Sequence, residues 1–134
     1  MNRLRTAVIG AGYLGRFHAQ KLDEIATAEL VGICDIDAET GQNLARDCNT
    51  VYYADHKDLI DKTDAVTIAT STSAHFELAK FFLENGVHVL VEKPMTKTSK
   101  QGRILTTIAT ARNLKLQVGH ICLLYTSDAA DEGL

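Results

Sequence analysis

The sequence predicts one α/β domain built on a doubly wound parallel sheet, and three observations point to this fold class. Short apolar segments alternate with amphipathic ones along the chain, which is the order of parallel strands joined by right-handed helical crossovers. The first apolar segment runs into Gly10, Gly12 and Gly15, a spacing typical of a strand that turns into a phosphate-binding helix. Of the 134 residues, 46% are apolar, so the chain can bury one core.

The expected strands are short and apolar throughout, as strands covered on both faces must be. About six are expected, at residues 6–9, 30–35, 51–53, 65–69, 87–92 and 116–119. The segments between them predict helices on both faces, at residues 13–24, 38–47, 56–62, 73–85 and 99–112. Asp37, Asp55 and Ser73 stand where N-cap residues are expected, and Asn85 with Gly86 ends the fourth helix.

The three glycines have separate tasks in a dinucleotide-binding turn. Gly10 permits the tight turn, Gly12 keeps a side chain away from the pyrophosphate, and Gly15 lets the helix pack closely on its strand. The motif alone is weak evidence. Its position between an expected strand and an expected helix strengthens the prediction of a dinucleotide site.

Asp35 ends the second expected strand, 20 residues after Gly15, where a carboxylate can accept hydrogen bonds from an adenosine ribose. An Asp at a strand end can instead cap only the next turn, but the glycine motif upstream favours the ribose role. Ile36 and Asp37 supply no cation for a 2′-phosphate, and Asp35 would repel one. We therefore expect NAD as the cofactor, with NADP less favoured.

Hydroxyl side chains follow the fourth expected strand, at Thr70, Ser71, Thr72 and Ser73, just before His75. Ligands of α/β proteins bind at the carboxyl ends of the strands, so these residues suit close contact with a nucleotide. An ordinary turn with a helix cap fits the composition equally well, and a lone His is typical of structural hydrogen bonding.

The fifth expected strand ends in Glu92, Lys93 and Pro94, the only proline of the chain. A lysine beside a nicotinamide can hold or protonate a substrate oxygen while hydride moves, so Lys93 is the candidate catalytic residue. The alternative is a solvated Glu-Lys ion pair at a strand end. A cis peptide bond before Pro94, which prolines allow, would re-aim the lysine.

Composition excludes several other classes of partner. The net charge of −3 and the pI of about 5.9 come without a basic stripe, so no nucleic-acid partner is expected. The apolar segments are too short to span a membrane, and a cytoplasmic location is expected. The three cysteines show no C-x-x-C spacing, so we expect neither a disulfide framework nor a metal site, and Cys34 is expected in the core.

Four segments in this order resemble the amino-terminal half of the Gfo/Idh/MocA family, the sugar and inositol dehydrogenases related to glucose-fructose oxidoreductase. They read A-V-I-G-A-G-Y-L-G, V-G-I-C-D, A-T-S-T-S-A-H and H-V-L-V-E-K-P-M-T, within residues 4–120. Where Ser71 and Thr72 stand, family members commonly have Pro-Asn. The resemblance implies that Lys93 is the catalytic lysine and that the cofactor contacts Gly10, Ala11, Gly12, Tyr13, Leu14, Asp35, Ile36, Thr70, Ser71, Thr72, Ser73, His75, Glu92 and Lys93.

Members of this family also have a second domain, which supplies most of the substrate pocket, a catalytic His with a nearby Asp, and the oligomer interface. Nothing of it follows residue 120, so we expect residues 1–120 to be an NAD(P)-binding Rossmann domain that is inactive alone. The full-length protein is expected to be a homo-oligomer that oxidises a secondary hydroxyl of a sugar, nucleotide sugar or cyclitol. Residues 121–134 look like a translated sequencing adapter, a natural loop being the alternative.

Two other functions use the same glycine motif. A regulatory dinucleotide sensor would need the glycine loop and Asp35, but would have no use for Glu92, Lys93 and Pro94. A two-domain dehydrogenase of amino acids or semialdehydes is the other alternative, and the same triplet argues against it less decisively.

Overall fold

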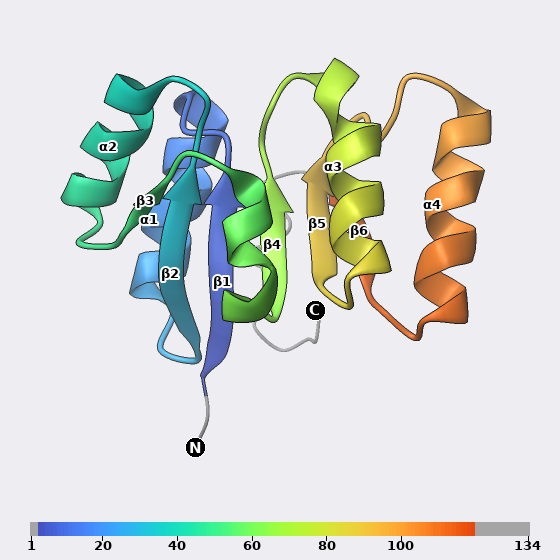
Figure 1. Cartoon of the computed structure of the whole chain (residues 1–134), viewed down its shortest axis with the longest axis horizontal. Helices are drawn as coiled ribbons and strands as arrows, with labels where there is room; N and C mark the ends of the chain where they lie inside the picture. The colour runs from blue at the N-terminus through green and yellow to red at the C-terminus, as the bar shows by residue number, and fades with distance from the viewer. Residues whose placement is uncertain (1–2, 120–134) are drawn as a thin grey trace.

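A computed structural model of the chain describes residues 3–119, so the expectation for residues 121–134 lies outside the described part. Its strands are β1 (Leu4–Ile9), β2 (Ala28–Cys34), β3 (Tyr52–Tyr53), β4 (Ala65–Ile68), β5 (His88–Glu92) and β6 (Leu116–Gly119). They form a six-stranded sheet in the order β3-β2-β1-β4-β5-β6, and every neighbouring pair is parallel (Figure 1). The doubly wound α/β fold is thereby confirmed.

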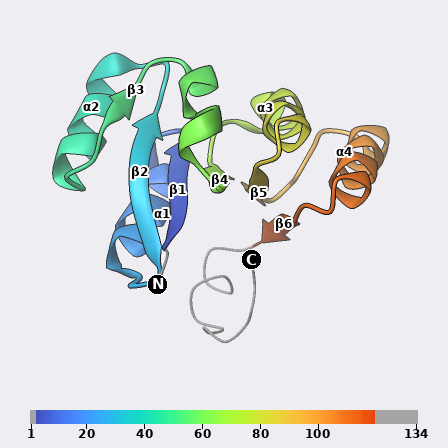
Figure 2. The same ribbon diagram turned by 60° about the horizontal axis from the view of Figure 1, so that its bottom comes forward.

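Helices cover both faces of the sheet because successive residues of a strand point to opposite sides. Val8 and Ile33 pack on α1 (Tyr13–Glu24) and α2 (Ala38–Asp47), through Ala19, Leu22, Leu44 and Ala45. The residues next to them along the strands point to the other face of the sheet, where they form a second hydrophobic cluster. This cluster packs against α3 (Thr72–Glu84), α4 (Ser99–Ala111) and a 3₁₀-helix, η1 (His56–Lys62). That cluster includes Ala7, Ile9, Cys34, Leu59, Phe82 and Leu105. Figure 2 shows α3 and α4 nearly end-on and beside each other.

The element boundaries agree with the sequence to within about two residues, and the differences have local causes. Asp37 and Asp55 are N-caps as expected, accepting from Thr40 N at 3.2 Å and Lys57 N at 2.9 Å. The expected cap at Ser73 is wrong, because α3 begins at Thr72, and its N-cap residue, Ser71, makes no side-chain capping hydrogen bond. The segment expected as a third helix is a 3₁₀-helix.

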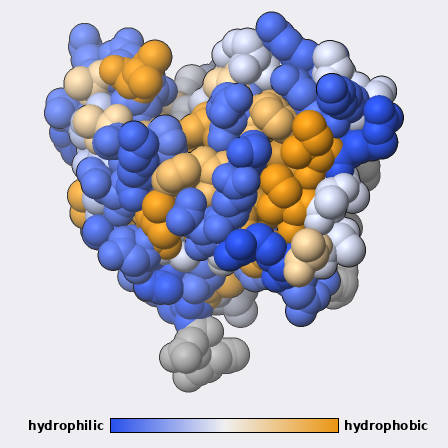
Figure 3. Space-filling model, turned by 45° about the vertical axis from the view of Figure 1, so that its right-hand side comes forward, coloured by the Kyte–Doolittle hydropathy of each residue, from blue (hydrophilic) through white to orange (hydrophobic). Residues whose placement is uncertain are grey.

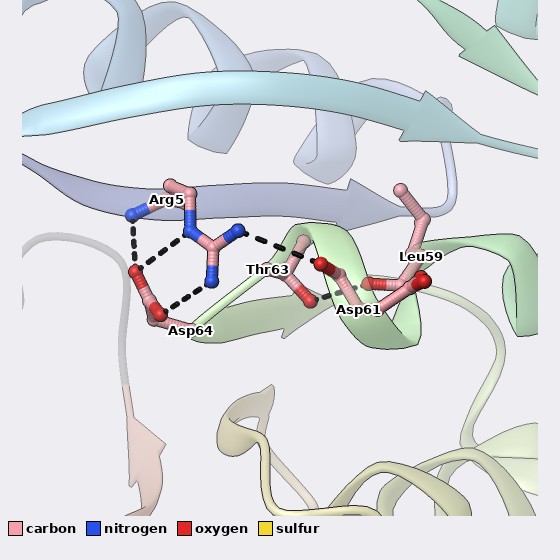
Figure 4. Close-up of polar contacts among 5 residues, drawn as sticks. All are labelled: Arg5, Leu59, Asp61, Thr63 and Asp64. Carbon is pink, nitrogen blue, oxygen red and sulfur yellow. Dashed lines mark hydrogen bonds and ion pairs between the residues drawn. The ribbon is translucent and has the colours of Figure 1, made fainter.

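The sheet is also fastened at its amino-terminal edge, away from the glycine loop. Arg5 in β1 meets Asp64, which directly precedes β4: the Arg5 N–H donates to Asp64 Oδ2 at 2.9 Å and Nη2 donates to Oδ1 at 3.0 Å (Figure 4). The Arg5 guanidinium holds the pKa of the Asp64 carboxyl below its usual value. Both side chains are exposed, so the pair contributes little to the stability of the fold.

The core is continuous with partly buried apolar side chains of the helices. Phe76, Phe81 and Ile108 pack against the cluster under α3 and α4, and apolar surface shows between hydrophilic ridges in Figure 3.

Cys34 is buried, and burial raises the pKa of its thiol to about 11, as expected of a core cysteine. No helix within residues 3–119 is long and apolar enough to cross a bilayer.

Candidate cofactor site

The residues singled out in the sequence meet at one edge of the sheet. β1, β2, β4 and β5 run parallel, so their carboxyl ends lie together. The glycine loop follows β1, Asp35 follows β2, the hydroxyl segment follows β4, and Lys93 follows β5. Two backbone hydrogen bonds tie the glycine loop to its neighbours: Gly10 N donates to Cys34 O at 2.7 Å and Ala69 N donates to Ile9 O at 2.8 Å.

Two of the three glycines are required by the backbone around them. Gly10 has a φ of +103°, and a Cβ there would stand 2.7 Å from the carbonyl oxygen of Ala69. A Cβ on Gly15 would stand 1.7 Å from the carbonyl oxygen of Gly10. Gly12 differs, because a Cβ there would meet no atom of residues 3–119 within 4 Å. Its open surroundings leave room for a group that approaches the backbone from outside.

The amino terminus of α1 opens onto this space. Gly12 is the N-cap and, as a glycine, offers no side-chain acceptor to the amides of the first turn. Exposed amides at a helix amino terminus, together with the helix dipole, favour an anionic group such as a pyrophosphate. The chain's own residues therefore fit the phosphates of a dinucleotide.

Asp35 is held in place by two backbone amides. Its Oδ2 accepts from Ala11 N at 2.7 Å, and its Oδ1 accepts from Asp37 N at 2.8 Å. The Tyr52 hydroxyl donates to the Asp35 carbonyl oxygen at 2.7 Å. Each carboxylate oxygen keeps a further lone pair, so Asp35 can still accept from two vicinal hydroxyls. The arrangement fits a ribose, and it links the end of β2 to the glycine loop.

Three large apolar side chains beside the glycine loop and Asp35 are exposed. Tyr13 is 86% exposed, Leu14 is 41% exposed, and Ile36 is 99% exposed. Tyr13 and Leu14 open α1 next to Gly12, and Ile36 follows Asp35 directly. Apolar side chains in these places can cover the flat faces of bound rings. Their roles as cofactor contacts stay predictions.

The hydroxyl segment lies at the same edge. Ser71 is the N-cap of α3 and Thr72 its first residue, and the hydroxyls of Ser71 and Ser73 lie 3.1 Å apart on the exposed surface. The Thr70 hydroxyl donates to Ser71 O at 3.2 Å. These residues are placed where a nucleotide could reach them, while their contact with one stays a prediction.

His75 is turned inward. Its ring is buried, with Nε2 3.1 Å from Thr70 O, and with Nδ1 2.9 Å from Pro94 O and 3.2 Å from Met95 O. The ring thus joins the loop after β4 to the loop after β5. The predicted contact of His75 with the cofactor stays a prediction.

Glu92 is also turned inward and lies against His18 of α1. The His18 side chain is completely buried, and its Nε2 contacts Glu92 Oε2. Burial lowers the pKa of His18 below its ordinary value, although the neighbouring Glu92 acts in the opposite direction. Sequence reasoning missed His18. The available signal was a polar residue on the buried stripe of α1, between Gly15 and Leu22.

Lys93 is exposed at the end of β5, and the peptide bond to Pro94 is cis. No ion pair within residues 3–119 involves Lys93. Since Glu92 faces His18, the simple Glu-Lys surface pair considered from the sequence does not form. Lys93 is left as an exposed cation at the edge of the sheet that carries the glycine loop.

A separate depression of about 630 Å³ lies between the loop after β5 and α4. Met95, Lys97, Thr98, Arg103 and Thr106 are among its lining residues. Neither the glycine loop nor Asp35 lines it, so it is distinct from the candidate cofactor site. No group of three or more His, Cys, Asp or Glu within the described part of the chain could hold a metal ion.

Comparison with known proteins agrees with this geometry. The family model described as "Oxidoreductase family, NAD-binding Rossmann fold" matches residues 4–120. UDP-N-acetylglucosamine 3-dehydrogenase of Acidithiobacillus ferrooxidans is 40% identical over 121 residues, which cover 90% of this chain and 38% of that protein. A solved structure of that enzyme superposes with a TM-score of 0.85 and covers 90% of this chain and 39% of its own.

Two further relatives also match most of this chain over about a third of their own length. Glucose-6-phosphate 3-dehydrogenase of Bacillus subtilis is 30% identical over 115 residues, which cover 86% of this chain and 33% of that protein. GenD2 from gentamicin A biosynthesis, solved in complex with NAD, is 29% identical with a TM-score of 0.86, covering 89% of this chain and 35% of its own. The chain thus spans less than two fifths of these relatives.

Proposed function

We propose that this chain, which belongs to the Gfo/Idh/MocA family of oxidoreductases, is the NAD-binding domain of a dehydrogenase acting on a secondary hydroxyl of a sugar, nucleotide sugar or cyclitol. The observation that carries the proposal is the Asp35 carboxylate, which accepts from Ala11 N and Asp37 N beside the open amino terminus of α1. The proposed partners of the ribose and of the pyrophosphate therefore lie next to each other, which supports a dinucleotide as the ligand.

The choice of NAD over NADP follows from charge. A 2′-phosphate on the adenosine ribose would meet the Asp35 carboxylate. Arg16, the cation next to the glycine loop in sequence, pairs instead with Asp47 at 2.9 Å. Ile36 and Asp37, which follow Asp35, provide no cation. We therefore infer a preference for NAD.

Lys93 is the residue of this chain proposed to act on the substrate. A bound nicotinamide would accept the hydride from the carbon that carries the hydroxyl. Lys93, exposed at the carboxyl end of β5, would hold the substrate oxygen and, in the reducing direction, return a proton to it. The remaining substrate contacts are proposed to come from the part of the relatives that this chain does not span.

The names of the relatives support the substrate class. UDP-N-acetylglucosamine 3-dehydrogenase and glucose-6-phosphate 3-dehydrogenase are named for sugar hydroxyls, and an inositol 2-dehydrogenase of Saccharopolyspora erythraea is 35% identical over 101 residues. Each name describes a nucleotide sugar, a sugar phosphate or a cyclitol. We propose the same class here and no single member of it.

Titration calorimetry of the chain with NAD, NADH and NADP tests the proposal. NAD is expected to bind at least about tenfold more tightly than NADP, a difference of about 1.4 kcal/mol. Asp35→Ala should weaken NAD binding, whereas Asp64→Ala, which removes a carboxylate at the opposite edge of the sheet, should not. Lys93→Ala should retain NAD binding, since Lys93 is assigned to the substrate. A folded chain that binds no dinucleotide would contradict the proposal.

A further inference from the structure

Two buried histidines reach the same short segment of chain from opposite faces of the sheet. His18 lies in α1, and His75 lies in α3 on the other face. His18 contacts the residue before Lys93, and His75 contacts the two residues after it. Within residues 3–119, Lys93 itself has no ion pair. The backbone around it is therefore fastened while its side chain is exposed.

The contact on the α1 side joins two charged or polar groups that are both removed from water. The exposed fraction is 0% for His18 and 8% for Glu92. A buried carboxylate without a partner is costly, so the His18 N–H fixes where the Glu92 side chain lies. Since α1 begins at the glycine loop, the contact also fixes the end of β5 relative to that loop.

The contact on the α3 side is made to main-chain atoms. The His75 ring is 2% exposed and lies between Thr70 O on one side and Pro94 O and Met95 O on the other. A flat, rigid ring that fills the space between two loops holds their separation constant. The loop after β5 is thus set against the loop after β4.

We propose that His18 and His75 are positioning residues that fix the main chain of Lys93 at the sheet edge, and with it the region that the lysine ammonium can reach. The inference rests on the proposed role of Lys93. Displacement of a reacting group by about 1 Å can lower the rate about 100-fold. Attachment of this backbone from both faces of the sheet would limit such a displacement of Lys93. Neither histidine needs to touch cofactor or substrate.

The test is an NMR measurement of backbone order on the ¹⁵N-labelled, cofactor-free chain. In the unsubstituted chain, the Lys93 amide should have an order parameter of about 0.85, typical of rigid backbone. In His18→Leu and His75→Leu the order parameter should fall below about 0.6, while the amides of β1 and β4 keep their order. His18→Gln and His75→Asn, which keep an N–H near the position of the lost one, should restore most of the order.

His88→Gln is the matched control, because His88 lies at the opposite end of β5 and accepts from Lys115 N at 3.0 Å. It should leave the Lys93 amide unchanged. Should the Leu variants fail to fold, His18→Asn, whose amide is too short to replace the imidazole, carries the same expectation of lost order.

A Lys93 amide that keeps its order in folded Leu variants would overturn the inference, as would a Lys93 amide already disordered in the unsubstituted chain. Loss of order spread evenly over the sheet would also contradict it, because that is the signature of a general structural role. The measurement uses no cofactor, so its outcome is independent of whether the chain binds NAD.

Discussion

The carboxylate of Asp35 accepts a hydrogen bond from the backbone N–H of Ala11 at 2.7 Å. The residue proposed to bind the ribose therefore also holds the glycine loop. One residue therefore joins two parts of the site that are 24 positions apart in sequence. Pre-organisation of this kind reduces the ordering that a ligand must impose when it binds.

Asp35→Ala is expected to lower the free energy of unfolding as well as NAD affinity. Ala11 is buried, and its N–H would lose its partner, at a cost of about 1–3 kcal/mol. Urea unfolding measures the change. Asp35→Asn keeps one acceptor oxygen and should lose less stability. An Asp35→Ala chain as stable as the unsubstituted one would show that the contact contributes nothing to the fold.

Alanine substitutions at two glycines should separate folding from binding. Gly15→Ala places a Cβ against the Gly10 carbonyl oxygen, a backbone atom that cannot move aside, so a loss of about 3 kcal/mol or more is expected. The methyl group of Gly12→Ala meets no atom of the described residues within 4 Å, and the change should cost about 1 kcal/mol or less, since Gly12 is only an N-cap.

Although Gly12→Ala should change stability little, it should weaken NAD binding strongly. The added methyl group occupies the space where the pyrophosphate is proposed to approach, so Gly12→Ala should weaken NAD binding by about tenfold or more. Calorimetry on the folded variant gives the affinity. Equal NAD affinities for Gly12→Ala and the unsubstituted chain would place the pyrophosphate elsewhere.

His18 should make stability fall at acid pH. Its pKa is lower in the folded chain than the ordinary value of 6.5, so the unfolded chain binds the proton more readily. The contribution of His18 to the free energy of unfolding should therefore be fully present above about pH 6.5, and the free energy of unfolding should decline as the pH falls below that value. Chemical unfolding at pH 7.5 and pH 5 measures the decline. His18→Gln should show a smaller one, and identical profiles would contradict this assignment.

The Arg5 and Asp64 pair should matter little to stability at neutral pH. Both side chains are exposed, so Asp64→Asn should lower Tm by about 5 °C or less, and less still in 1 M salt. The folded pKa of Asp64 is lowered, so any contribution is present above its ordinary value of 3.8 and is lost as the pH falls below that. A large, salt-insensitive drop in Tm, measured by thermal unfolding, would be inconsistent with a screened surface pair.

The sheet and most of the site could be predicted because their signals are local. The glycine spacing, the Asp after an apolar strand, and the charged triplet after another each lie within a few residues. The rule that ligands bind at the carboxyl ends of parallel strands then brings them together. Two of the glycines and Asp35 have the surroundings that the motif requires.

The contacts of His18 and His75 could not be predicted in this way. His18 and Glu92 are 74 positions apart, and their contact depends on how α1 lies across the sheet. His75 contacts Pro94 and Met95 only because α3 packs beside the end of β5. The wrong cap at Ser73 has a smaller cause, since Ser71, two residues earlier, is an equally suitable N-cap residue.

The most direct test of the central claim is the map of ¹H–¹⁵N chemical-shift changes when NAD is added to the labelled chain. The account predicts that the largest changes fall on the amides of Gly12, Tyr13, Leu14, Asp35 and Ile36. Changes confined to the residues that line the separate depression, at 95–99, 102, 103, 106 and 107, would contradict it. So would a spectrum that NAD leaves unchanged.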